Sequence, residues 1–299
     1  MRSTAVVAAF CLACIVVASG QAAPVLVGIL EDTPGQFTGQ TYYRSVRVAF
    51  QRGALKWNAF PGGDCPNSEC LRSIVTKFPA QVNWTIAFDG KSLGQVLGRT
   101  PSSFRSYSTV GQQEIVGGAA PPTIGKRSDE YRGWGSEPVY RPLVAVSVPY
   151  VRDPDGWKPA RVGADSARIV RSAFRNRYPK AVNCANDQSP AKPWPYTDAD
   201  ITLNKAYESS RRWMLVAVRL RASKCDGPPD EPYWQHWFVV TPERQARFLD
   251  SDMWFVDAGD YDNDGRSELI FSVEGYNRGG YRLFYDDFKG KAAFEFGYH

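Results

Sequence analysis

The stretch that most constrains this chain is a run of acidic residues set between two apolar, strand-like segments near the C-terminus. In AGDYDNDGRSEL the carboxylates follow the pattern D-x-D-x-D-G-x-x-E. Calcium takes about six to eight oxygen ligands, and closely spaced carboxylates on one tight loop supply them. Gly265 allows the positive φ with which such a loop turns back around an ion. The pattern therefore predicts a Ca²⁺ site formed by the side chains of Asp260, Asp262, Asp264 and Glu268 and the carbonyl of Arg266.

The same loop also has a reading without a metal. Asp, Asn and Gly are common turn formers, and Asp-Asn-Asp-Gly between apolar runs can close a hairpin by itself. Crowded carboxylates repel one another unless a cation or a proton intervenes, which favours the metal. A helix-loop-helix calcium motif fits poorly, because its glutamate stands at the twelfth position. Here Glu268 is the ninth residue of the series, and the flanking segments are strand-like.

The loop and its flanks resemble one FG-GAP or VCBS-type repeat over about residues 254–288. The matching elements are Gly259-Asp260, Asp264-Gly265, Glu268-Leu269-Ile270, and Tyr281 to Phe284 after Gly279-Gly280. The chain departs from that pattern at Ser272-Val273-Glu274, where the family often has Gly-Ala-Pro, and by carrying Glu268 where the family has Asp. The resemblance implies a calcium-carrying blade unit like those of integrin-like β-propellers.

The first 22 residues have the build of a secretory signal peptide of bacterial type. Arg2 supplies a basic start, residues 5–17 are almost uninterruptedly apolar, and Gly20 and Ala22 place small residues before a cleavage point. The apolar run is short for a bilayer span of about 20 residues, which disfavours the alternative of an uncleaved anchor. We expect a secreted or periplasmic protein, residues 23–299, with no transmembrane segment.

Export changes the expected chemistry of the cysteines. The mature chain keeps an even number of them, and oxidising compartments favour disulfides. Among three possible pairings, the spacing favours Cys65 with Cys70 and Cys184 with Cys225.

Between the signal and the acidic loop, β-branched and aromatic runs alternate with Gly, Pro, Asn and Asp. Asp89-Gly90 between two such runs predicts a hairpin. We therefore expect a mainly β fold in a single domain, with a possible internal boundary near 185–197. A propeller-like arrangement of antiparallel sheets with one helix inserted is the favoured architecture. The alternative is a β-sandwich followed by a C-terminal calcium hairpin. The expected strands are 25–30, 45–50, 82–88, 143–148, 213–219 and 237–240.

Two stretches interrupt this β pattern. Residues 101–137 are rich in Gly, Pro and Ser and predict a long loop. Residues 165–178 predict a helix that Asp165 caps and Pro179 ends. Its arginines, which favour a solvated face over a docking surface, are Arg168, Arg171, Arg175 and Arg177.

The net charge and the small number of histidines limit the classes of function that fit this chain. Without Arg2, 35 basic residues face 31 acidic ones, a net charge of +4 that is spread along the chain and predicts no nucleic-acid role. The histidines are His236, expected in a strand interior, and His299, so an imidazole-based triad is poorly supplied. The sequence favours a non-enzymatic binding or adhesion-type module for a protein or glycan ligand, with a structural calcium.

Two alternatives stay open at this point. One is a secreted polysaccharide hydrolase that uses a pair of carboxylates. Its acids would come from a set that nothing else in the sequence engages, namely Asp153, Asp155, Glu208 and Asp230. The other is an envelope protein whose function is assembly with a partner chain.

Overall fold

The computed structural model describes residues 23–34, 42–63, 65, 67–117, 120–126, 128–132, 138–150, 152–182, 192–221, 231–275 and 277–298. The expected signal peptide, Cys184, Cys225, Asp230 and His299 lie outside the described residues. No helix within the described ranges is long and apolar enough to span a bilayer.

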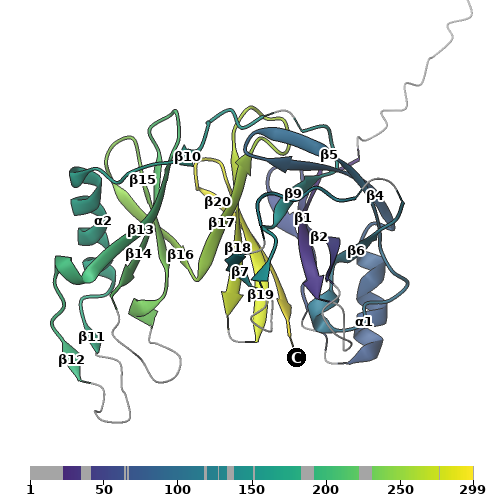
Figure 1. Ribbon diagram of the computed structural model, residues 1–299, viewed down its shortest axis with the longest axis horizontal. Coiled ribbons are helices and arrows are strands. Elements are labelled where there is room, and N and C mark those ends of the chain that lie inside the picture. Colours follow the sequence, from purple (N-terminus) through teal and green to yellow (C-terminus); the bar gives the residue numbers. More distant parts are fainter. Residues whose placement is uncertain are drawn as a thin grey trace, which may run out of the picture.

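The elements form four successive layers (Figure 1). One helix, α2 (Ala164–Arg177), covers a five-stranded antiparallel sheet, which packs on a four-stranded antiparallel sheet. The far face of the four-stranded sheet packs on a β-barrel. The mainly antiparallel β fold predicted from the sequence is therefore confirmed.

The barrel forms the N-terminal half of the chain. Its strands follow the order β1-β9-β4-β5-β6-β2, and β1 also pairs with β2, which closes the ring. Closure leaves these six strands without a free edge. A further strand, β3, pairs antiparallel with the end of β2. The strands are β1 (Leu26–Pro34), β2 (Tyr42–Arg52), β3 (Trp57–Ala59), β4 (Gln81–Phe88), β5 (Lys91–Arg99), β6 (Gln112–Ile115) and β9 (Leu143–Val146). Short helices beside the barrel are α1 (Ser68–Ile74), η1 (Val75–Lys77) and η2 (Tyr107–Thr109).

The C-terminal half contains the two open sheets. The five-stranded sheet consists of β10 (Lys158–Pro159), β13 (Ile201–Glu208), β14 (Met214–Leu220), β15 (His236–Val240) and β16 (Ala246–Ser251). The four-stranded sheet is a meander of β17 (Met253–Gly259), β18 (Glu268–Gly275), β19 (Arg278–Tyr285) and β20 (Gly290–Gly297). Smaller elements are β7 (Ser128–Arg132), β8 (Pro138–Val139), β11 (Ala181–Val182), β12 (Pro193–Trp194), η3 (Asp198–Asp200) and η4 (Glu231–Tyr233).

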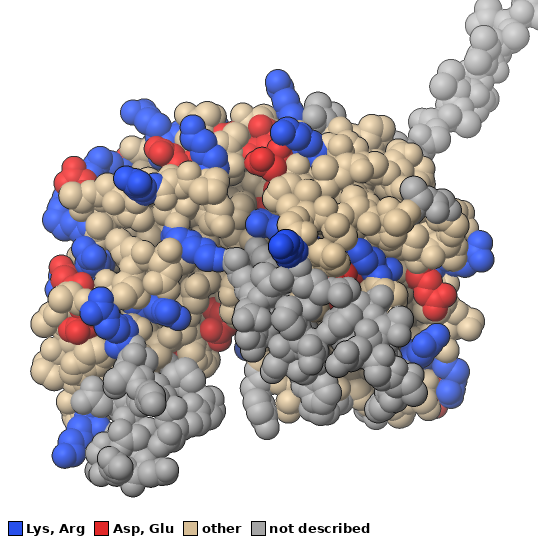
Figure 2. All heavy atoms as spheres, viewed as in Figure 1, with Lys and Arg blue, Asp and Glu red and all other residues tan. Residues whose placement is uncertain are grey.

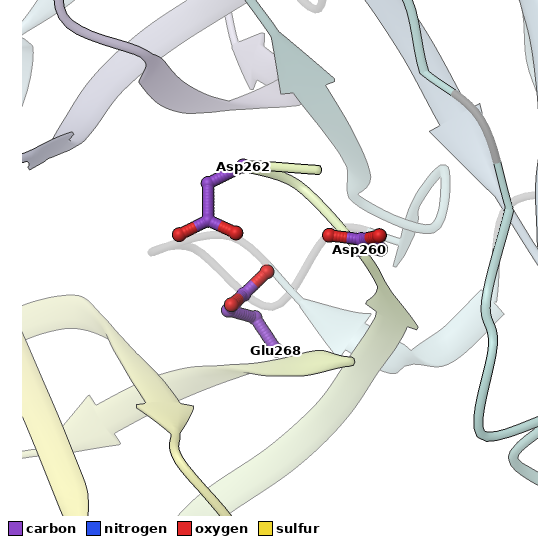
Figure 3. A group of neighbouring side chains, drawn as sticks. All are labelled: Asp260, Asp262 and Glu268. Atoms are coloured by element: carbon purple, nitrogen blue, oxygen red, sulfur yellow. The ribbon is translucent and has the colours of Figure 1, made fainter. Parts of the chain in front are cut away.

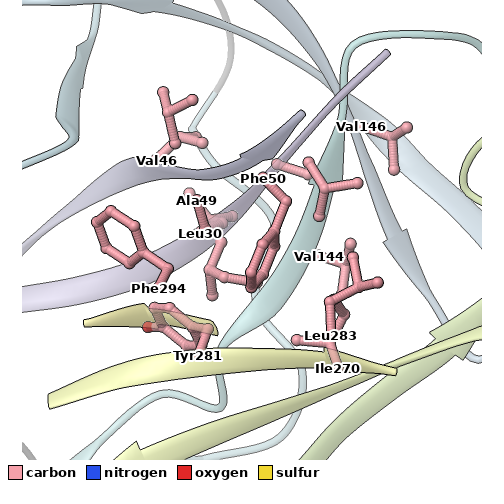
Figure 4. Packing of buried hydrophobic residues seen from close by; sticks show 14 of the residues in the cluster. Leu30, Val46, Ala49, Phe50, Val144, Val146, Ile270, Tyr281, Leu283 and Phe294 are labelled. Carbon is pink, nitrogen blue, oxygen red and sulfur yellow. The ribbon is translucent and has the colours of Figure 1, made fainter. Parts of the chain in front are cut away.

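The four-stranded sheet is buried on both faces, and this explains its near-continuous apolar sequence. On one face Ile270 and Leu283 meet barrel residues such as Phe50 (Figure 4). On the other face the Phe271 ring lies 5.2 Å from that of Trp237 in the five-stranded sheet, centroid to centroid. Alternate residues of β18 therefore serve two different cores, and the sheet joins the two halves of the molecule.

Helix α2 forms where the sequence predicts it. Val170 and Phe174 are fully buried against the five-stranded sheet. The expected cap is wrong: Gly163 occupies the N-cap, and Asp165 lies in the first turn, where it pairs with Arg244 at 2.9 Å. Basic side chains on the face seen in Figure 2 are scattered among acidic ones, and Arg175 is paired with Asp198 at 2.8 Å. The helix face is thus a mixed-charge surface.

Three further expectations have clear outcomes. The Asp89-Gly90 hairpin is confirmed, with φ of 48° and 69° at the two residues. The Cys65–Cys70 disulfide is present beside α1. The expectation of one long loop over 101–137 is wrong in part, because that range contains β6. This short, polar strand lies between β5 and β2 and completes the barrel.

The propeller-like arrangement is not confirmed. A closed barrel, and not a set of separate blades, forms the N-terminal half, and α1 is a second helix that the sequence pattern does not predict. The two C-terminal sheets do pack face to face, as in the sandwich alternative, with the acidic loop on the second sheet.

Candidate metal centre

The acidic loop joins β17 to β18 at the side of the four-stranded sheet that faces the barrel. Gly259 and Glu268 are partners in the strand register, so residues 260–267 form a loop closed at its base by this pair. Asn263 and Gly265 adopt positive φ of 61° and 88°. These two positions let the chain reverse within the loop, as the sequence predicts for Gly265.

Three carboxylates converge inside this loop. Asp260, Asp262 and Glu268 each offer one oxygen, and these oxygens all lie within 4.8 Å of one another (Figure 3). Asp260 and Glu268 are only 7% and 2% exposed. Hard carboxylate oxygens at this spacing are the donor set that Ca²⁺ prefers, so the residues fit the ion that the sequence pattern implies.

Backbone N–H groups of the same loop hold the carboxylates in place. The two oxygens of Asp260 accept from the N–H groups of Asp264 and Gly265, both at 2.9 Å. One oxygen of Glu268 accepts from the N–H of Tyr261 at 2.8 Å. Backbone hydrogen bonds of the loop therefore help to orient its acidic side chains.

Burial disfavours the ionised form of all three converging carboxylates. Burial, and after it the neighbouring charge of Asp262, raise the pKa of Glu268 to about 9. Burial is also the main cause that raises the pKa of Asp260 and of Asp262. Either protons or a cation must offset this cost when the loop is folded.

One basic side chain reaches the group from the barrel. Arg52, the last residue of β2, places its Nε 2.5 Å from Oδ2 of Asp262. Within the described chain, this is the ion pair that involves the three converging carboxylates. The loop of the four-stranded sheet and the barrel thus meet at a charged contact.

Asp264 lies apart from the other expected side-chain ligands. It is exposed and does not belong to the converging group; its Oδ1 accepts from the N–H of Arg266 at 2.9 Å. The side chain of Arg266 is exposed and lies 3.8 Å from Asp287, and its carbonyl stays a predicted ligand. The structure therefore brings together Asp260, Asp262 and Glu268 of the expected set.

Sequence reasoning missed the segment that supports the loop from outside. Asp260 donates its N–H to the carbonyl of Arg152 at 3.1 Å, and Ser267 donates its hydroxyl to Asp153. The N–H of Asp155 bonds the Ser267 hydroxyl at 3.2 Å. The turn sequence Asp-Pro-Asp-Gly at 153–156 signals a tight turn but not what it contacts.

These contacts also bear on the hydrolase alternative. Asp153 accepts from the N–H of Trp157 at 2.6 Å as well as from Ser267, and Asp155 pairs with Arg211 at 3.4 Å. Both acids are engaged in holding turns, and Glu208 lies on β13 beside β10. Asp153 and Asp155 therefore have structural partners, while Asp230 lies outside the described residues.

His236 is the first residue of β15 and has no exposed surface. Its Nε2 is 2.8 Å from the carbonyl oxygen of Glu231, and its Nδ1 is 3.3 Å from the hydroxyl of Tyr178. The histidine is a core residue of the five-stranded sheet, as expected.

Comparison with known proteins identifies no match to this chain among protein-family models, curated proteins or solved structures.

Proposed function

We propose that this chain is a secreted or periplasmic, non-enzymatic binding or adhesion-type protein whose fold is held by one structural Ca²⁺. The convergence of Asp260, Asp262 and Glu268 carries the proposal. Three buried or half-buried carboxylates with one arginine beside them offer both the negative charge and the donor type that a cation site needs. The FG-GAP or VCBS-type pattern of the loop supports the same ion.

The position of the loop supports a structural and not a catalytic role for the ion. A catalytic metal keeps an open coordination position for water or substrate. Here Glu268 is almost fully buried, and the loop is braced by the backbone of Arg152 and by Arg52 of the barrel. A bound ion would offset the charges of these carboxylates and stabilise the loop that joins β17 to β18.

The surface of the described residues favours a protein partner over a glycan. Glycan sites commonly use exposed aromatic rings, yet every described tryptophan is buried or half-buried. Among the described residues, the large apolar side chains that are exposed are Tyr43 and Leu55. Binding would then rely on polar loops, in keeping with a mixed-charge surface (Figure 2).

Thermal unfolding of the oxidised, signal-free protein tests the calcium site. We expect the melting temperature to rise between EDTA and millimolar Ca²⁺, because binding to the folded state stabilises it by mass action. Glu268→Gln should remove that rise. Asp198→Asn, which changes an exposed acid paired with Arg175, is the matched control and should keep it. A wild-type melting temperature that does not respond to Ca²⁺ would contradict the proposal.

A further inference from the structure

Arg52 contacts Asp262, one of the three carboxylates that a bound cation would also contact. Its Nε contacts Oδ2 of Asp262 at 2.5 Å, and the Asp262 side chain is only 4% exposed. The contact comes from another layer of the fold, since Arg52 ends barrel strand β2 while Asp262 lies between β17 and β18. A guanidinium is a permanent positive charge, so it acts here as an internal counter-ion.

The pairing of Arg52 is incomplete. A guanidinium can bind a carboxylate with two parallel N–H groups, and such bidentate pairs are the strong ones. Arg52 uses Nε for Asp262, while its Nη1 is buried and makes no hydrogen bond to any described residue. The side chain packs near the Trp57 ring, 5.9 Å from its centroid. One contact that leaves a buried donor unpaired is easier to exchange than a complete bidentate pair.

A cation and Arg52 would oppose each other at this loop for two reasons. Both require the charge of Asp262, and each positive charge repels the other across a poorly solvated space. All three carboxylates accept hydrogen bonds from N–H groups of their own loop, but within the described chain Asp262 is the one that also pairs with a basic side chain. Asp262 is therefore the ligand at which binding is tuned.

We propose that Arg52 is a built-in competitor that weakens cation binding by Asp260, Asp262 and Glu268. The inference rests on the proposed calcium site and adds its regulation. Because the ion and Arg52 share the charge of Asp262, ion binding weakens the contact between β2 and the β17–β18 loop. The affinity of the loop is thereby coupled to the packing of the barrel against the four-stranded sheet.

Calorimetric titration of Ca²⁺ into the full signal-free protein tests this competition. Arg52→Gln removes the charge and keeps a polar side chain of similar reach. We expect it to bind Ca²⁺ at least about tenfold more tightly. Even in water, the repulsion between a guanidinium and a divalent ion ~6 Å apart weakens binding by about that factor. Arg52→Lys keeps the charge and should bind close to wild type. Arg105→Gln, an exposed barrel arginine paired with Glu114, is the matched control.

The outcomes separate this inference from the calcium proposal. If the wild type binds and Arg52→Gln binds equally or more weakly, Arg52 positions Asp262 and the competition is wrong, while the calcium site stands. If only Arg52→Gln binds, the arginine blocks the site and the competition is supported. If neither protein binds Ca²⁺, both proposals fail. Circular dichroism of each variant establishes that the compared chains are folded.

Discussion

The carboxylate of Asp257 in β17 accepts a hydrogen bond from the backbone N–H of Asp89 at 3.1 Å. Asp89 lies at the tip of the β4–β5 hairpin, so this bond joins the four-stranded sheet to the barrel. The side chain of Asp257 is buried, and its second oxygen has no hydrogen bond among the described residues. Burial raises the pKa of Asp257 to about 7, although the N–H groups of Asp89 and Ala258 lower it.

This pKa predicts how stability depends on pH. An unfolded Asp257 releases its proton near its ordinary pKa of 3.8, whereas the folded protein keeps it to about pH 7. The folded state therefore binds more protons in this window, and the free energy of unfolding falls as pH rises through it. Asp257→Asn keeps the acceptor for Asp89 without the charge. Its stability relative to wild type should rise by roughly 1–4 kcal/mol from pH 4 to pH 8.

Urea unfolding at a series of pH values, in EDTA, measures this difference. Asp198→Asn serves again as the control, because its exposed carboxylate should leave the pH profile of wild type unchanged. Parallel profiles for wild type and Asp257→Asn would show that Asp257 does not titrate in this range.

A second prediction concerns which carboxylates bind the ion. Asp264 is exposed and outside the converging group, whereas Glu268 is buried within it. We expect Asp264→Asn to keep most of the calcium-dependent rise in melting temperature and Glu268→Gln to lose it. In EDTA near pH 7, Glu268→Gln should melt above wild type, because Glu268, whose pKa is raised to about 9, must take up a proton on folding and Gln need not. Equal losses in both variants would make Asp264 a ligand.

Local chemistry explains what the sequence could predict. The hairpin at Asp89-Gly90 and helix α2 depend on residues adjacent in the chain, and both form. The convergence of Asp260, Asp262 and Glu268 follows the same rule, because the loop that carries them is closed by neighbouring strands. Such features need only short-range geometry.

The barrel could not be predicted in the same way. The ring requires β1 to pair with β9, a strand more than 100 residues later, with Leu30 opposite Leu143. No local sequence pattern encodes that contact. Strand β6 has the sequence QQEI in a stretch rich in Gly and Pro, so it lacks an apolar signal. Its Gln113 is fully buried, and the side-chain oxygen accepts a hydrogen bond from the Trp84 indole at 2.8 Å, which offsets the cost of burying the amide. Arg52 is likewise brought to Asp262 only by packing of the barrel on the sheet.

A third prediction uses His236. Burial lowers its pKa to about 4 from 6.5, and its Nε2 must carry the proton because the partner is the carbonyl oxygen of Glu231. The unfolded chain takes up a proton near pH 6.5, so this part of the stability is lost as pH falls from 6.5 towards 4. The chain has two histidines, so nitrogen NMR of wild type and His299→Gln assigns His236 directly. An imidazole signal of His236 that titrates near pH 6.5 would contradict its buried, neutral state.

Arg47 provides the last prediction, because this fully enclosed cation ties the barrel to the final strand. It is 2% exposed, donates to Glu31 through Nε at 2.5 Å and through Nη2 at 3.1 Å, and lies over the Phe296 ring at 3.8 Å. Arg47→Met fills a similar volume but leaves Glu31 without its partner, so we expect a loss of about 3–5 kcal/mol in urea unfolding. Adding Glu31→Gln should recover part of it, since the unpaired charge is then gone. Arg105→Met breaks the exposed pair with Glu114 and should cost about 0–1 kcal/mol. A loss for Arg47→Met as small as that of Arg105→Met would mean that the enclosed pair adds no net stability.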